Sequence, residues 1–126
     1  MKKVGMYTIV EEKTYDEGQV IFNENSSEAG LFIVISGLVE TSRSVEGRKF
    51  VIDTLQPGDI LGEMEIVGGM ERSITAKAVQ KTALGVIDQK PFQQEYNQLS
   101  RQFRNILESV PVRLKKMLDR ACDFSA

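Results

Sequence analysis

The sequence predicts a mainly β protein that ends in helices. Between Lys13 and Asp88, short apolar runs alternate with turn residues at close intervals, a pattern typical of an antiparallel sandwich or barrel. After Lys90 the apolar residues recur with a period of about 3.6 instead of two, which indicates helices. A glycine-rich stretch at residues 57–79 also contains acids and an arginine, and it is the best candidate for a ligand site.

The strands are expected within about residues 10–89, with turn residues at close intervals between them. The segment 1–12 remains ambiguous. Turns are expected at Asp16-Glu17-Gly18, at Ser36-Gly37 and at Gln56-Pro57-Gly58-Asp59, where Pro and Gly have their usual places. The expected strands are 19–22, 31–36, 38–44, 49–55, a short one before Gly62, 74–78 and 83–88.

Two helices are expected after the strands, at about 91–97 and 99–121. Pro91 can open the first helix, and Pro111 predicts a kink or a restart within the second. The second helix carries an apolar stripe, which either packs on the chain's own barrel or forms a homodimer interface. The stripe consists of Leu99, Phe103, Ile106, Leu107, Val110, Leu114, Met117, Leu118 and Ala121.

Length and composition fit one soluble domain over residues 1–126. Hydrophobic residues make up 41% of the chain and charged residues 27%, close to globular averages. Apolar runs such as residues 31–35 are too short to cross a bilayer, and no apolar segment follows the basic start. We therefore expect no membrane span and a cytoplasmic location.

The residue types present disfavour an enzyme. Histidine is absent, which removes the imidazole ligands that small β-barrel metal enzymes use, so no metal site is expected. The single cysteine, Cys122, has no partner for a disulfide and no grouping of base and orienting residue around it. Residues 90–126 carry a net charge of +3 against −5 for 1–89, but without a helix-turn-helix this pattern does not support DNA binding.

The stretch at residues 57–79 has the chemistry of a phosphate loop. After Gly62, residues 63–67 can form one helical turn, whose free N–H groups attract anions. The planar fork of Arg72 suits a phosphate, and the Ser73 hydroxyl can donate to the same anion. Glu63 can only accept when ionised, so it suits sugar hydroxyls. Acid and base on one loop predict a ligand that carries both hydroxyls and an anion.

These segments resemble the cyclic nucleotide-binding domain family, which occurs in the catabolite activator protein, in cAMP- and cGMP-dependent kinases and in cyclic nucleotide-gated channels. The resemblance covers about residues 10–121. The motifs that carry it are Glu17-Gly18-Gln19-Val20-Ile21-Phe22, Leu31-Phe32-Ile33-Val34-Ile35-Ser36-Gly37, Gln56-Pro57-Gly58-Asp59, and Gly62-Glu63 followed by Arg72-Ser73.

The resemblance implies an eight-stranded antiparallel jelly roll (double-stranded β-helix) with a short phosphate-binding helix and a long C-terminal helix. It implies a regulatory module that binds cAMP or cGMP, needs no other cofactor, and passes occupancy through its C-terminal helices to an effector protein. In the bacterial relatives the long helix forms a dimer seam, which implies a homodimer through 99–121.

The resemblance also assigns the site residues. Glu63 would accept from the ribose 2′-hydroxyl, Arg72 would clamp the cyclic phosphate, and Ser73 would support it. Backbone near Gly62 and Met64 would donate to the phosphate. The base would lie against strand side chains such as Val51.

Two departures from the family pattern keep an alternative open. Glu65 stands where a small residue is usual, and Glu71 stands where many members have Pro. A degenerate domain that binds no ligand and acts in dimerisation or protein–protein interaction fits these acids. In that case Glu63 and Arg72 would form a structural ion pair that braces the loop. The sequence does not separate cAMP from cGMP.

Overall fold

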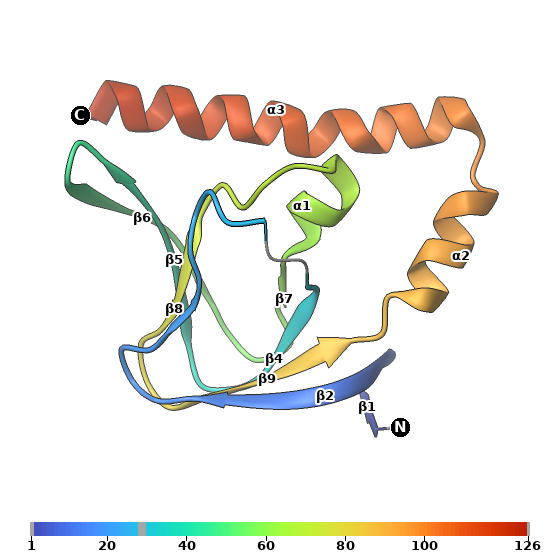
Figure 1. The fold of residues 1–126 in the computed structure, drawn as a ribbon, viewed down its shortest axis with the longest axis horizontal. Helices are drawn as coiled ribbons and strands as arrows, with labels where there is room; N and C mark the ends of the chain where they lie inside the picture. Colours follow the sequence, from blue (N-terminus) through green and yellow to red (C-terminus); the bar gives the residue numbers. More distant parts are fainter. Residues whose placement is uncertain (1, 28–29, 126) are drawn as a thin grey trace.

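The computed structural model describes residues 2–27 and 30–125. Two antiparallel sheets form a roll, and the chain then leaves it as two helices (Figure 1). The strands are β1 (Lys2–Val4), β2 (Tyr7–Tyr15), β3 (Val20–Phe22), β4 (Phe32–Ser36), β5 (Val39–Val45), β6 (Arg48–Leu55), β7 (Ile60–Leu61), β8 (Thr75–Ala78) and β9 (Thr82–Ile87), and the helices are α1 (Glu63–Gly68), α2 (Lys90–Gln98) and α3 (Arg101–Ser125).

The predicted β fold with C-terminal helices is confirmed. One sheet has the order β1-β2-β9-β4-β7 and the other β3-β8-β5-β6. The described residues form nine strands where eight were expected, because β1 folds back on β2 with Lys2 opposite Ile9. This hairpin lies in the segment that the sequence pattern left ambiguous.

The core lies between the two sheets, where the inward side chains of each strand meet. The strands β3, β4, β5, β7, β8 and β9 supply its members. They are Phe22, Phe32, Val34, Val39, Leu61, Ala76 and Leu84. A smaller cluster of Ile9, Leu31, Ile33 and Ile87 continues toward α1, with Ile66 packed against it. The second cluster ties the short helix to the first sheet.

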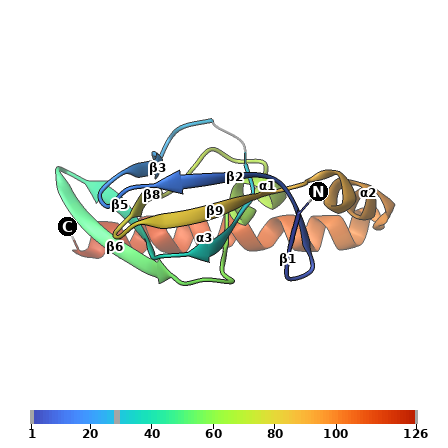
Figure 2. The same ribbon diagram turned by 90° about the horizontal axis from the view of Figure 1, so that it is seen from below.

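The helix α3 runs along one side of the roll and packs against α1 and the end of β5 (Figures 1 and 2). It is continuous through Pro111, so the helix does not restart there. Pro111 is buried beside Gly68 of α1, where an added Cβ on Gly68 would lie 3.0 Å from the proline ring. Packing against α1 holds the helix across a residue that removes one of its hydrogen bonds.

Several large apolar side chains of α3 remain exposed to solvent. These are Phe103, Ile106, Val110, Val112, Leu114 and Met117.

None of the helices within the described residues combines the length and the apolar character that a membrane span requires.

Candidate functional site

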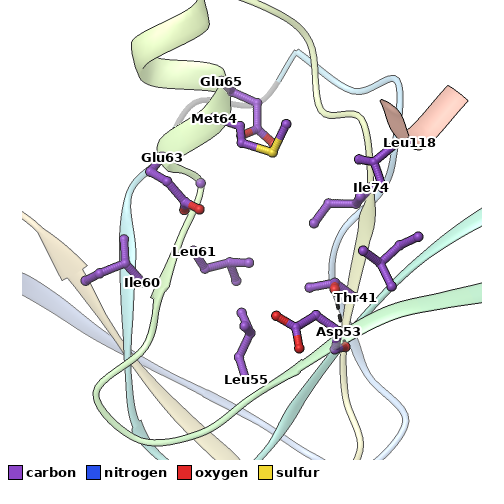
Figure 3. A pocket seen from close by; sticks show the side chains of 12 residues that line it. Thr41, Asp53, Leu55, Ile60, Leu61, Glu63, Met64, Glu65, Ile74 and Leu118 are labelled. Carbon is purple, nitrogen blue, oxygen red and sulfur yellow. Dashed lines mark hydrogen bonds between the residues drawn. The ribbon is translucent and has the colours of Figure 1, made fainter. Parts of the chain in front are cut away.

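A cavity of about 140 Å³ opens between α1, β6, β7 and the side of α3 (Figure 3). Apolar side chains form most of its wall, and three carboxylates, those of Asp53, Glu63 and Glu65, also border it. The full lining is Thr41, Ile52, Asp53, Leu55, Ile60, Leu61, Gly62, Glu63, Met64, Glu65, Ile74 and Leu118. The cavity therefore combines an apolar surface with hydrogen-bond acceptors.

Gly62 shapes the rim of this cavity at the start of α1. Its φ of 99° lies in the region that favours glycine. A Cβ at this position would lie 2.3 Å from the carbonyl oxygen of Gly30 and 3.0 Å from Nη1 of Arg72. Glycine is thus required both by the backbone angle and by the close approach of two segments distant in sequence.

Arg72 lies behind this rim and is only 2% exposed. Its Nη2 donates to the Gly30 carbonyl at 3.1 Å, and its guanidinium carbon lies 4.0 Å from the centre of the Phe22 ring. Its Nε and Nη1 have no hydrogen-bond partner among the described residues. A buried cation with two unused donors is costly unless an acceptor reaches it, so this group is prepared for an anion.

Glu65 is the acid that approaches Arg72. Its Oε1 lies 3.4 Å from Nη1, and its side chain is 10% exposed. The sequence alternative paired Arg72 with Glu63 instead. Residues two apart on a helix do not face the same side, so only one of the two acids can turn toward the arginine. The structure therefore pairs Arg72 with Glu65 and leaves Glu63 directed into the cavity (Figure 3).

Glu63 is exposed as a whole residue, but its carboxyl turns into the cavity. Desolvation raises its pKa above the usual 4.5, and the negative charge of Glu65 adds to this effect. A hydrogen bond from its own backbone N–H and the positive charge of Arg72 act in the opposite direction. Hydrogen bonds from ligand hydroxyls would favour the ionised form of this carboxyl.

Ser73 follows Arg72 and is 3% exposed. Its hydroxyl has no hydrogen-bond partner among the described residues. Its carbonyl accepts from Nε of Arg43 at 3.1 Å, and Nη1 of the same arginine bonds to Oδ1 of Asp119 on α3 at 2.5 Å. Arg43 thus connects the Arg72-Ser73 segment to the last third of the long helix.

The structure brings Gly62, Glu63 and Met64 to the cavity, with Arg72 directly behind Gly62. It does not bring Val51 there, because this side chain is 58% exposed on β6 and the cavity is lined by Ile52 and Asp53.

A β-bulge explains this arrangement. Thr41 pairs with Asp53, but the next residue, Ser42, pairs with Val51, so Ile52 is the extra residue of β6. The bulge breaks the alternation of side chains, and two consecutive residues of β6 line the cavity. No pattern in the sequence marks its position, and Leu118 could be assigned to the cavity only from the docking of α3.

Fold and site together define a β-roll binding module built around a buried arginine. The chain belongs to the family of the cyclic nucleotide-binding domain, which matches residues 12–98. This is the family that the glycine, Gly62-Glu63 and Arg72-Ser73 motifs resemble, and the prediction is confirmed.

Curated relatives agree with this assignment. The chain is 29% identical over 112 residues to the cyclic AMP receptor protein of Thermus thermophilus, covering 88% of this chain and 50% of that protein. It is 33% identical over 88 residues to human cGMP-dependent protein kinase 2, covering 68% of this chain and 12% of the kinase. The chain therefore spans half or less of these two relatives.

Solved structures show the same fold. The Thermus thermophilus catabolite activator protein superposes with a TM-score of 0.62 at 26% identity, covering 91% of this chain and 52% of that one. The EAL enzyme Bd1971 in its cAMP-bound form reaches a TM-score of 0.79, covering 90% of this chain and 30% of that one. Its identity of 19% makes the second likeness one of fold alone.

Proposed function

We propose that this domain binds a cyclic nucleotide, cAMP or cGMP, and acts as a regulatory rather than a catalytic module in the cytoplasm. The observation that carries the proposal is the buried Arg72, of which two donor nitrogens, like the neighbouring Ser73 hydroxyl, have no partner among residues 2–27 and 30–125. Membership of the family supports the same ligand class. Both relatives described above are named for a cyclic nucleotide, one for cAMP and one for cGMP.

Each part of the ligand has a matching group. The cyclic phosphate would bind Arg72 and Ser73, with backbone donors near Gly62 and Met64. The ribose 2′-hydroxyl would donate to Glu63, whose carboxyl points into the cavity. The base would lie against the wall of β6. There Ile52 and Asp53 line the cavity, next to Val51, the residue predicted from the sequence to contact the base.

Occupancy would reach α3 through Arg43. A phosphate that draws the Arg72-Ser73 segment toward itself also moves the Ser73 carbonyl, to which Arg43 donates. Arg43 in turn holds Asp119, whose other oxygen lies 3.3 Å from the Lys115 ammonium. A displacement of the loop would therefore alter an ion pair on the helix. An effector protein that contacts α3 would receive this change.

Calorimetric titration with cAMP and with cGMP tests the binding proposal. The native chain should bind at least one of them, and Arg72→Ala should weaken binding by about 1.5–3 kcal/mol, a tenfold loss or more. Arg48→Ala removes the same charge from an exposed position on β6 and should leave affinity unchanged. Circular dichroism verifies that the variants are folded. Absence of binding by the native chain would favour the alternative, a degenerate interaction domain.

The exposed face of α3 supports a homodimer. Phe103, Ile106, Val110 and Met117 recur at spacings of three, four and seven, as in the seam between two helices, and Ile106 is 64% exposed. We propose that a second copy of this chain covers this face. Sedimentation over a wide concentration range should show a dimer that Ile106→Glu dissociates and the neighbouring exposed control Asn105→Glu does not. A native chain that stays monomeric throughout would contradict the dimer.

A further inference from the structure

The Glu65 carboxylate lies where an anion bound to Arg72 would have to lie. Both side chains are shielded from water, at 10% exposure for Glu65 and 1% for Arg72. We propose that Glu65 is an internal competitor for the anion site: its carboxylate occupies Arg72 until a ligand displaces it. The proposal rests on the proposed function, because it concerns the affinity of that same site. Under this proposal, Glu65 determines how strong the interactions of an anion with the site must be before the anion can displace it.

The geometry fits a temporary occupant. The Oε1 to Nη1 distance of 3.4 Å gives charge neutralisation, but within the described part of the chain Nη1 and Nε form no hydrogen bond. The pair therefore compensates the buried charge while leaving the directional donors unused. A phosphate oxygen within hydrogen-bonding distance of these donors would form the hydrogen bonds that Glu65 does not form.

Displacement is required because two anions cannot share one guanidinium without strong repulsion in a poorly solvated site. Glu65 borders the cavity, so its side chain has space on the cavity side into which to turn. Moving it separates a buried ion pair, and this cost is the same for every anion that enters. The competitor thus shifts all anion affinities by one common factor.

An equal loss of affinity leaves a weak ligand unbound at concentrations at which a strong ligand still binds. Inorganic phosphate has neither a ribose nor a base, so its contacts with Arg72 and Ser73 alone must offset the displacement of Glu65. A cyclic nucleotide adds a hydroxyl for Glu63 and a base for the wall near Ile52. Glu65 therefore keeps simple anions out of the site while a ligand with several contacts can still enter.

The test compares inorganic phosphate, cAMP and cGMP as ligands of the native chain, Glu65→Gln and Glu65→Ala, at constant ionic strength. Titration calorimetry and thermal shift are both recorded. We expect both substitutions to tighten phosphate binding about tenfold or more, the factor for one charge-assisted interaction that no longer has to be broken. Nucleotide binding should tighten by the same factor. Glu71→Gln removes an equal charge from an exposed neighbour of Arg72 and should change neither.

The outcomes separate this inference from the proposed function. If both Glu65 variants gain phosphate affinity but no protein binds a nucleotide, the competitor stands and the cyclic nucleotide assignment fails. If the native chain binds nucleotide and the Glu65 variants bind neither ligand more tightly, the assignment stands and the competitor is wrong. A gain for nucleotide alone would also overturn the inference, because displacement predicts an equal gain for phosphate. If one of the two Glu65 variants does not fold, the other variant provides the test.

Discussion

Replacing Gly62 with alanine tests how tightly the site is built. Any L residue at a φ of 99° costs about 1–2 kcal/mol in backbone strain. The new Cβ would also lie 2.3 Å from the Gly30 carbonyl oxygen and 3.0 Å from Arg72 Nη1. Relief of such overpacking adds about 1–3 kcal/mol. We therefore expect Gly62→Ala to lower the free energy of unfolding by about 2–5 kcal/mol.

Gly58 provides the matched control. Its φ is 96°, and an added Cβ there would meet no atom within 4 Å. Gly58→Ala should pay only the backbone cost of about 1–2 kcal/mol. Urea unfolding monitored by circular dichroism gives both free energies of unfolding. The dependence of the free energy on urea concentration should be the same for the two variants and the native chain. Equal losses for the two variants would refute the claim that contact between Gly62 and Gly30 shapes the site.

Two pH-dependent predictions follow from the charged groups. Desolvation holds the pKa of Glu63 above 4.5. The contribution of this raised pKa to the free energy of unfolding is therefore present below pH 4.5 and is lost as the pH rises through the folded-state pKa. Urea unfolding of Glu63→Gln across that range should no longer show this loss. Hydrogen bonding from Arg43, assisted by Lys115, holds the pKa of Asp119 below 3.8. Its contribution is therefore present above 3.8 and is lost as the pH falls through the lowered value, and Asp119→Asn should make the acid limb of the stability profile shallower. An unchanged profile in either variant would contradict the corresponding assignment.

Much of the fold could be predicted because local signals agree with it. The turn at residues 56–59 contains Pro57 and Gly58, and it precedes the short strand β7 as expected. The change of period after Lys90 marks α2 and α3, which span Lys90–Gln98 and Arg101–Ser125 against predicted helices at 91–97 and 99–121. The ends differ by a few residues because helix termini depend on packing as well as on pattern.

The site could be predicted only where one segment supplies it. The motif at residues 62–73 contains Glu63 and Arg72, and the structure places both next to Gly62. The base side of the cavity depends on the register of β5 with β6, and one bulge replaces the expected Val51 with Ile52. Long-range contacts of this kind leave no periodic trace in either strand.

In the proposed function, the buried Arg72 is the group through which the domain would respond to a ligand. Its Nη2 bonds the Gly30 carbonyl, its Nη1 lies near Glu65 without bonding it, and its Nε has no partner among the described residues. Buried donors without partners cost free energy that a suitable acceptor would recover. A ligand that satisfies these donors favours the rearranged loop by the difference in contacts between the two states. Because Arg43 bonds both the adjacent Ser73 carbonyl and Asp119, the proposed function would pass part of that free energy to α3.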